Sequence, residues 1–455
     1  MPAAIGTHSE MSFGQTKFIK FIQQNVSAIV LLLVLLVITV PQFAKSLHSA
    51  NDLPFSWTAS KFWIQSAECA RTTGAILSLC KDGGLVPMAD GFGGDDPGHA
   101  LALDIYSLLS QKAVTPADIS VLNSIFNYAG ILILALLLFR LKLSFASFLL
   151  LAAGPLIADQ FHATSPHPAQ FGCACLVALF PLALLGLPAT GSNRKTLVAW
   201  LALAVVGIAI AALFRQAIGL MGMVAGFMAL AIHALARLRP RNNLTFKAAM
   251  AVALLISYQA PYLVLKARDA IFHLPPSTML EQHGIWHNLY IGLGAAPNPF
   301  GIEWADANAK AAAERIDPSV VVSSPRYFDI LREQYFEILA HHPIDVVVVY
   351  LRKLEITLKT GLPGRINVLE ALLLLGFASA IYVSLSLRSK PGWTAVDAAL
   401  IMSWIYIIFF IGQAMLFHYS IQYLFPIQIF FLLIIGVTAE CIRSVIAFRI
   451  AGTSR

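Results

Sequence analysis

Long apolar runs separated by short polar segments dominate the chain. A hydrocarbon layer of roughly 30 Å requires about 20 mainly apolar residues per helix, and ten runs approach that length. These predicted spans are Val26 to Phe43, Leu122 to Phe139, Leu143 to Ala158, Pro168 to Leu187, Leu197 to Phe214, Ile218 to Leu235, Ala248 to Leu265, Val368 to Leu385, Ala395 to Leu416 and Ile421 to Ala439. The pattern predicts an all-α polytopic membrane protein in which residues 1–455 form a single membrane domain.

The stretch from Leu197 to Arg239 must hold two of these spans. As one helix it would extend about 64 Å, roughly twice the hydrocarbon thickness. Its polar interruption is Arg215 and Gln216, with Gly219 nearby, and a charge in mid-bilayer costs about 2.5 to 3.5 kcal/mol. We therefore expect the chain to turn at Arg215, at a membrane boundary.

Two segments between spans are long enough to carry function, 46–120 and 266–343. Within the first, residues 97–109 form a predicted amphipathic helix whose apolar face holds Leu101, Ile105, Leu108 and Leu109. After the second, residues 344–362 are too short and too charged to span. We expect both helices to lie at the membrane interface.

Composition and charge support the prediction of a polytopic membrane protein. The chain is 58% hydrophobic and 12% charged, with a mean hydropathy of +0.73, which exceeds what one soluble core requires. The net charge of +7 is concentrated at every second span boundary, which is the positive-inside pattern. Membrane lipids, and not nucleic acid, are therefore the expected partner, with both termini in the cytoplasm and the two long loops on the exterior face.

The most informative motif is GGDDPGH, Gly93 to His99, directly before the amphipathic helix. Asp96 before Pro97 is a typical helix start, because the carboxylate accepts from free backbone amides and proline suits the first turn. Asp95 is not needed for that cap. It is available as a general base or as a ligand of a divalent metal ion.

The overall arrangement resembles a known family. Its first features are the order of the first span, the long loop with an acidic pair, and the helices with short loops. The second long loop adds three motifs, which are GIWHNLYIGLG (Gly284 to Gly294), PNPFGIEWADANA (Pro297 to Ala309) and the His341, His342, Pro343 triplet. Together they resemble the GT-C class of polyprenyl-phosphate-dependent glycosyltransferases, in particular bacterial relatives of the protein mannosyltransferase and aminoarabinose transferase group.

The resemblance implies a bacterial inner-membrane enzyme that transfers a sugar from a polyprenyl-phosphate donor to an acceptor on the periplasmic face. A carboxylate, Asp95 or Asp96, would activate the acceptor hydroxyl. Many members place that carboxylate soon after the first span, where this chain has Asp52. Cations would stabilise the departing phosphate, and the candidates are Arg215, Arg326 and Arg352.

Substrate contacts are expected in the second loop, from His283, Trp286, His287, Tyr290, Glu303 and Asp306. Histidines also gather at other exterior boundaries, including His418. His283 and His287 share one helical face, but no glutamate follows in the zincin pattern, so no zinc site is predicted. Trp286 and Tyr290 could stack on a sugar or belong to an interfacial aromatic belt.

The cysteines fall into two groups. Cys69 and Cys80 lie in the first exterior loop, where an oxidising periplasm favours a disulfide. Cys173 and Cys175 lie in a predicted span, and Cys441 lies at a cytoplasmic end. The sequence therefore predicts one disulfide, between Cys69 and Cys80.

Two other functions remain open on the sequence alone. A polymerase or ligase of lipid-linked glycans would also use exterior arginines. A secondary transporter would place ionisable residues and broken helices near the bilayer midplane, often in repeated halves. The charges of this chain lie mainly in the exterior loops, which favours a surface active site.

Overall fold

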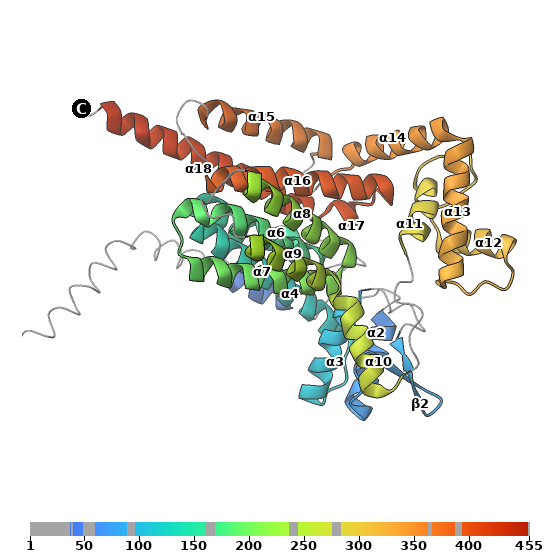
Figure 1. Cartoon of the computed structure of the whole chain (residues 1–455). Helices are drawn as coiled ribbons and strands as arrows, with labels where there is room; N and C mark the ends of the chain where they lie inside the picture. Colours follow the sequence, from blue (N-terminus) through green and yellow to red (C-terminus); the bar gives the residue numbers. More distant parts are fainter. Residues whose placement is uncertain are drawn as a thin grey trace, which may run out of the picture.

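The structure is a computed structural model that describes residues 37, 40–48, 60–88, 96–159, 169–235, 244–274, 284–362, 366–386 and 394–453. A helical bundle forms its body, and two lobes project from one end of that bundle (Figure 1). The bundle helices are α4 (Pro116–Arg140), α5 (Ser144–Asp159), α6 (Gln170–Gly186), α7 (Arg194–Phe214), α8 (Gln216–Leu235), α9 (Leu244–Tyr258), α15 (Val368–Ser386), α16 (Ala395–Leu416) and α18 (Ile427–Thr453).

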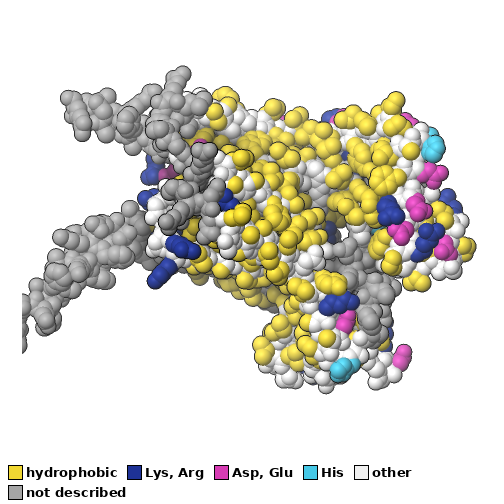
Figure 2. Space-filling model, in the orientation of Figure 1, with side chains coloured by type: hydrophobic (Ala, Val, Ile, Leu, Met, Phe, Trp, Pro, Cys, Tyr) yellow, Lys and Arg dark blue, Asp and Glu magenta, His cyan; other side chains and the backbone are white. Residues whose placement is uncertain are grey.

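The bundle is that of a polytopic membrane protein. Among the described residues, five helical segments are long and apolar enough to cross a membrane, or six if the bent pair α9 and α10 (Ala260–Phe272) is one span. α5, α6 and the Val368–Ser384 part of α15 are shorter apolar helices. Figure 2 shows a mostly hydrophobic flank on the bundle. Large apolar side chains of the bundle helices, such as Leu132 and Val206, are exposed.

Helix α6 occupies the centre of the bundle. Every residue from Gln170 to Gly186 is buried, against α4, α7, α8 and α16. A helix that is apolar on all sides is stable only when other helices or lipid surround it. α6 therefore serves as the packing axis of the bundle, and its N-terminus lies at the lobe end, where the amide of Gly172 donates to Asn127 on α4.

The predicted turn at Arg215 is confirmed. α7 ends at Phe214 and α8 begins at Gln216, with Arg215 extended between them at φ −161°. The predicted span 248–265 is wrong as one straight helix, because α9 ends at Tyr258 and α10 departs at 61°. Pro261 lies in the first turn of α10, where its missing amide is tolerated but a continuous helix is not.

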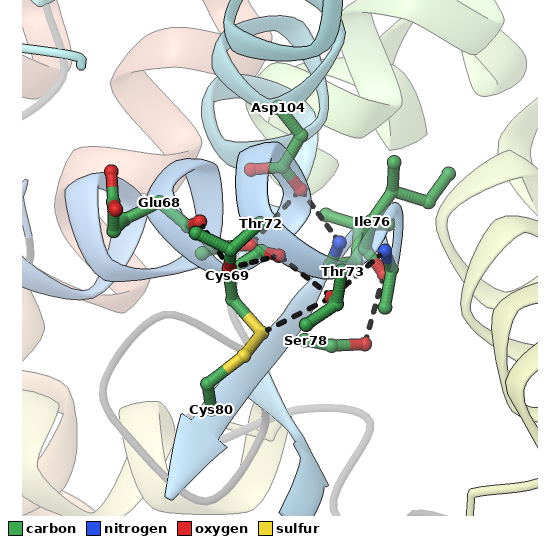
Figure 3. The surroundings of a disulfide bond; sticks show 11 residues. Glu68, Cys69, Thr72, Thr73, Ile76, Ser78, Cys80 and Asp104 are labelled. Atoms are coloured by element: carbon green, nitrogen blue, oxygen red, sulfur yellow. Dashed lines mark hydrogen bonds between the residues drawn. A yellow bond between two sulfur atoms is a disulfide. The ribbon is translucent and has the colours of Figure 1, made fainter. Parts of the chain in front are cut away.

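The first lobe consists of α2 (Ser60–Thr73), β1 (Ser78–Lys81), β2 (Gly84–Pro87), α3 (Gly98–Ser110) and α10. The hairpin departs from the all-α expectation. Its two-residue turn is Asp82 and Gly83, both at positive φ, which is the conformation that Asp-Gly hairpin turns adopt. Cys69 and Cys80, the pair predicted from the sequence, form a disulfide that joins α2 to β1 (Figure 3).

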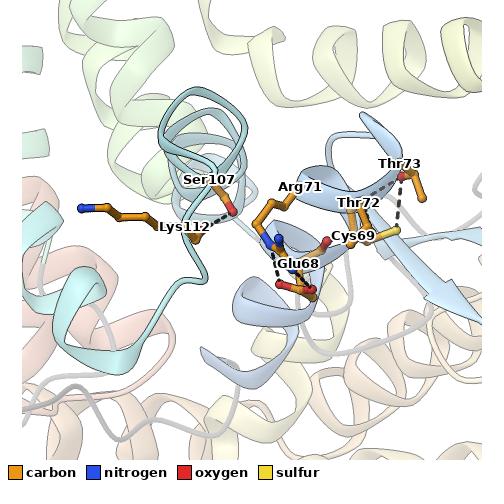
Figure 4. Close-up of polar contacts among 7 residues, drawn as sticks. All are labelled: Glu68, Cys69, Arg71, Thr72, Thr73, Ser107 and Lys112. Atoms are coloured by element: carbon orange, nitrogen blue, oxygen red, sulfur yellow. Dashed lines mark hydrogen bonds and ion pairs between the residues drawn. The ribbon is translucent and has the colours of Figure 1, made fainter.

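Short-range polar contacts lie at the C-terminal ends of α2 and α3. Arg71 and Glu68 pair on α2, and the hydroxyl of Ser107 donates to the carbonyl of Lys112 just beyond α3 (Figure 4). Gln111 ends α3 in the left-handed region at φ 57°. The disulfide cross-links a small lobe whose own apolar core is modest, whereas the exposed Arg71–Glu68 pair adds little to its stability.

The polar face of α3 is the buried one. Asp104 and Ser107 are buried, whereas Ile105 and Leu109 of the apolar face are exposed. The carboxylate of Asp104 accepts from the hydroxyl of Ser66 and from the amide of Leu77. Arg268 on α10 donates to the carbonyl of the same Leu77, at 2.7 Å. The peptide groups of Leu77, a left-handed residue at φ 52°, are thus held from both α3 and α10.

The buried Asp104 predicts a pH dependence of stability. Burial raises the pKa of its carboxyl to about 7, against the opposing hydrogen bonds from Leu77 and Ser66. A folded-state pKa above the unfolded one means that the stabilisation is full below pH 4 and is lost as the pH rises through 7. Asp104→Asn mimics the neutral acid. Its melting temperature relative to wild type should rise between pH 5 and pH 8, whereas Asp82→Asn in the exposed hairpin turn should show no trend; a constant Asp104→Asn difference would contradict this.

The second lobe consists of α11 (Ile285–Gly292), η3 (Leu293–Ala295), α12 (Asp306–Ile316), α13 (Pro325–His341) and α14 (Pro343–Lys359). A separate hydrophobic cluster fills it, which includes Tyr290, Tyr327 and Leu331. α14 returns the chain to the bundle, where it packs against α16 and α15 (Figure 1). The predicted interfacial segment 344–362 is thus a helix with Ile344, Val347 and Leu351 exposed along one side.

Candidate functional site

Asp96 and Arg215 meet at the lobe end of the bundle, although 119 positions separate them. Nη1 of Arg215 donates to Oδ2 of Asp96 at 2.8 Å, and the backbone amide of Gln216 donates to Oδ1 at 2.8 Å. The predicted capping of the 97–109 helix by Asp96 is therefore wrong, because α3 has no side-chain cap. Asp96 instead caps α8, a helix that is distant in the sequence. The first backbone amides of α8 carry partial positive charge.

Local backbone geometry directs Asp96 toward α8. Asp96 lies in the left-handed region at φ 55°, which aspartate tolerates better than most residues. Gly98 then passes so close to α7 that a Cβ there would lie 2.8 Å from the backbone of Leu213 and Phe214. Glycine is thus required at position 98, because the start of α3 packs directly on the backbone at the end of α7. This packing brings the Asp96 carboxylate to the α7–α8 turn.

The surroundings of the pair combine partial burial with aromatic rings. The side chains of Arg215 and Asp96 are 18% and 13% exposed. The guanidinium carbon of Arg215 lies 5.6 Å from the ring centre of Tyr423, which belongs to α17 (Ile421–Leu424). Such a contact adds an attraction between cation and π face. The site therefore draws on the first lobe, the α7–α8 turn and the segment between α16 and α18.

His99 is the last residue of the GGDDPGH motif and lies in the first turn of α3. Its ring stacks on Trp63 at 4.4 Å and meets the edge of Phe214 at 4.8 Å. Nε2 lies 2.8 Å from the amide oxygen of Asn123 on α4. Burial lowers the pKa of His99 to about 4, against the opposing hydrogen bond to Asn123. The ring is therefore neutral at physiological pH and fixes α3 against α4.

The predicted substrate contacts in the second loop are mostly built into the second lobe. His287 is buried, with Nδ1 2.7 Å from the hydroxyl of Tyr327 and Nε2 3.1 Å from Asp306. Tyr290 is buried in the lobe core and Trp286 packs against Phe336. Their direct contacts thus stabilise the lobe, and a contact of these residues with substrate stays a prediction.

The remaining predicted residues are spread over the lobe surface. Glu303 and Arg326 are exposed, before α12 and in the first turn of α13 respectively. Arg352 on α14 is exposed and donates to the carbonyl of Pro297 at 2.9 Å. Of the three predicted phosphate ligands, Arg215 is the one with a carboxylate partner from the GGDDPGH motif. Asp52, Asp95 and His283 lie outside the described residues.

Sequence reasoning missed Lys353 on α14. The side chain is fully buried, and Nζ donates to the carbonyls of Gly292, Leu416 and Phe417 at 2.8, 3.1 and 2.8 Å. Burial lowers the pKa of Lys353 to about 7, while three carbonyl acceptors match the three donors of an ammonium group. Lysine at a helix C-terminus also suits the dipole of α16. The sequence offers little signal for this residue, because Lys353 lies between Arg352 and Glu355 in a charged stretch that is typical of an exposed helix face.

Among the residues that the structure describes, no group of three or more His, Cys, Asp or Glu side chains is placed to hold a metal ion. The arrangement is that of a polytopic membrane protein with a carboxylate and a guanidinium held together at the end that carries its two lobes. No protein-family model, curated protein or solved structure matches the chain.

Proposed function

We propose that the protein is a membrane glycosyltransferase of GT-C type, which moves a sugar from a polyprenyl-phosphate donor to an acceptor at the periplasmic face of a bacterial inner membrane. The observation that carries the proposal is the Asp96–Arg215 pair. It joins the acidic motif of the first lobe to a guanidinium at a span boundary. A membrane-bound donor would present its phosphate at that depth.

We further propose ten spans with both termini in the cytoplasm. Seven of the predicted spans each follow one described helix, whereas 248–265 covers parts of α9 and α10, and 421–439 covers α17 and part of α18. The tenth, Val26 to Phe43, lies mostly outside the described residues. Figure 2 displays Lys and Arg side chains at the bundle end away from the lobes, where α4 ends with Arg140 and α7 begins with Arg194. By the positive-inside rule, that end is cytoplasmic and the lobes are periplasmic.

The chemistry requires a base for the acceptor and a cation for the leaving phosphate. Asp96 accepts from two donors at once, so its role is to position Arg215 and the α7–α8 turn. Arg215 can serve a phosphate through one edge of its planar guanidinium and a carboxylate through another. Asp95, which directly precedes Asp96 in the sequence, is then the proposed base that takes the proton of the acceptor hydroxyl.

Asparagine variants test this division of roles. Asp95→Asn should lower sugar transfer from a lipid-linked donor by about a hundredfold or more, since a general base contributes roughly that much. Asp96→Asn should also lower transfer, because Arg215 loses its charged partner. The measurement is transfer in membranes at matched protein levels.

The hairpin turn supplies a matched control. Asp82 has the same left-handed backbone as Asp96, at φ 49°, and is exposed in the same lobe. Asp82→Asn should therefore transfer at the wild-type rate. Near wild-type transfer by Asp95→Asn would remove Asp95 from the chemistry and leave Asp52, Glu303 and Asp306 as the carboxylates to test.

A further inference from the structure

A row of aromatic side chains runs from Arg215 toward the second lobe. Tyr423 lies beside the guanidinium, and the next ring, His418, is 6.3 Å from Tyr423. His418 stacks on Tyr419 with ring centres 5.0 Å apart and planes within 10°. Trp304, which precedes α12 in the second lobe, lies 4.8 Å from His418. We call Tyr423, His418, Tyr419 and Trp304 the aromatic row.

The four rings are neither buried nor fully exposed. Rings that belong to a hydrophobic core are normally sealed, as Tyr406 and Phe410 are in the bundle. Trp304 is at the margin of the second-lobe cluster, whereas the other three rings come from the segment that connects α16 to α18. Two separate parts of the chain therefore meet through their aromatic side chains at the lobe end.

The ring of His418 is held in one orientation. Its Nδ1 accepts from the backbone amide of Ser420 at 3.0 Å, which leaves the proton of the neutral ring on Nε2. Burial lowers the pKa of His418, and the nearby charge of Lys353 lowers it further. A neutral imidazole with a fixed Nε2–H is suited to donate to a hydroxyl group and to stack beside other rings.

Lys353 fixes the backbone beneath the row. Its ammonium group binds the carbonyls of Leu416 and Phe417, the two residues directly before His418. Its third bond goes to Gly292 in the second lobe, where a Cβ would lie 2.6 Å from the carbonyl oxygen of Leu416. The row thus rests on a rigid junction between bundle and lobe, as a preformed binding surface requires.

We propose that the aromatic row is the subsite for the sugar ring of the lipid-linked donor, with the donor phosphate at the Arg215 end. This inference rests on the proposed function and adds to it the residues that contact the sugar. The C–H groups of a pyranose or furanose face pack against aromatic faces, and its hydroxyl groups find a donor in His418 and hydroxyl partners in Tyr419 and Tyr423. A phosphate beside a sugar matches a guanidinium beside aromatic rings.

Equilibrium binding separates the sugar from the rest of the donor. The probes are short-chain prenyl phosphates that carry glucose, mannose, galactose or arabinose, and the same prenyl phosphate without a sugar. Wild-type protein in lipid nanodiscs should bind at least one sugar-bearing probe about fivefold to tenfold more tightly than the sugarless probe. Trp304→Leu and Tyr419→Leu should lose that gain, whereas Trp304→Phe and Tyr419→Phe, which keep a ring, should retain most of it.

Tyr262→Leu is the matched control, because Tyr262 is an exposed tyrosine on α10 outside the row, and it should keep the full gain. Hydroxyl-radical footprinting of the wild-type protein covers the case in which a leucine variant fails to fold. The sugar-bearing probe, and not the sugarless one, should protect Trp304 and Tyr419. Equal protection by both probes, or an unchanged gain in folded leucine variants, overturns the inference.

The two proposals fail in different ways. Normal sugar transfer by the wild type without any sugar-dependent gain in binding overturns the subsite and leaves the transferase standing. A sugar-dependent gain that the leucine variants abolish supports the subsite. If that gain occurs in a protein that transfers no sugar, the proposed transferase is wrong and the row is a saccharide site of another activity.

Discussion

Arg215→Lys is expected to lower sugar transfer about a hundredfold or more. Loss of one donor aimed at developing negative charge costs roughly 10² to 10³ in rate. A lysine keeps the charge but cannot bridge Asp96 and a phosphate with a planar fork. The change should therefore fall mainly on kcat, measured as transfer from a lipid-linked donor in proteoliposomes.

The other two candidate phosphate ligands serve as controls. Arg326 and Arg352 are exposed on the second lobe, and Arg352 already donates to the carbonyl of Pro297. Arg326→Lys and Arg352→Lys should stay within about fivefold of wild type, since exposed ion pairs contribute about 1 kcal/mol at most. A larger loss for either of them than for Arg215→Lys would move the phosphate site to the second lobe.

Lys353→Met should destabilise the folded protein strongly. Methionine has a similar length and fills the space. The carbonyls of Gly292, Leu416 and Phe417 would remain buried, however, and each of them would lose the hydrogen bond that it accepts from Lys353. Each buried unsatisfied group costs about 1 to 3 kcal/mol, so the total loss is roughly 3 kcal/mol or more. The expected result is a clear fall in the apparent melting temperature and faster proteolysis within the second lobe.

Lys359→Met on the same helix is the matched control. Lys359 is exposed and pairs with the exposed Glu355, and such surface pairs contribute little. Its melting temperature should equal that of the wild type. A Lys353→Met protein as stable as the Lys359→Met protein would show that the three carbonyls are satisfied in another way, and the rigid junction beneath the aromatic row would lose its support.

The helices of the bundle could be predicted because the thickness of the hydrocarbon layer sets the length of the apolar run that spans it. Each described helix of the bundle follows an apolar run, and the charge of Arg215 located a turn to the residue. The break after Tyr258 was missed because Gln259 and Pro261 lie inside a run that is apolar enough to continue. The hairpin was missed although Asp82-Gly83 is a strong short-range turn signal.

The candidate site shows the limit of sequence reasoning more sharply. Asp96 and Arg215 were each selected for local reasons, one as a helix cap and the other as a charge at a boundary. Their pairing could not be predicted, since it depends on how closely Gly98 passes the end of α7. The contacts of His287 were equally hidden, because a histidine that faces Tyr327 and one that faces substrate have the same sequence neighbours.

The position of α10 decides how this protein could be rebuilt. In the sequence, α10 opens the second long loop, yet Arg268 binds Leu77 and Leu265 packs in the core of the first lobe. Residues 46–120 expressed alone would therefore lack one wall of their lobe and expose the carbonyl of Leu77. A chimaera that exchanges the first lobe between two proteins of this fold should transplant residues 60–110 together with residues 260–274, as a discontinuous cassette.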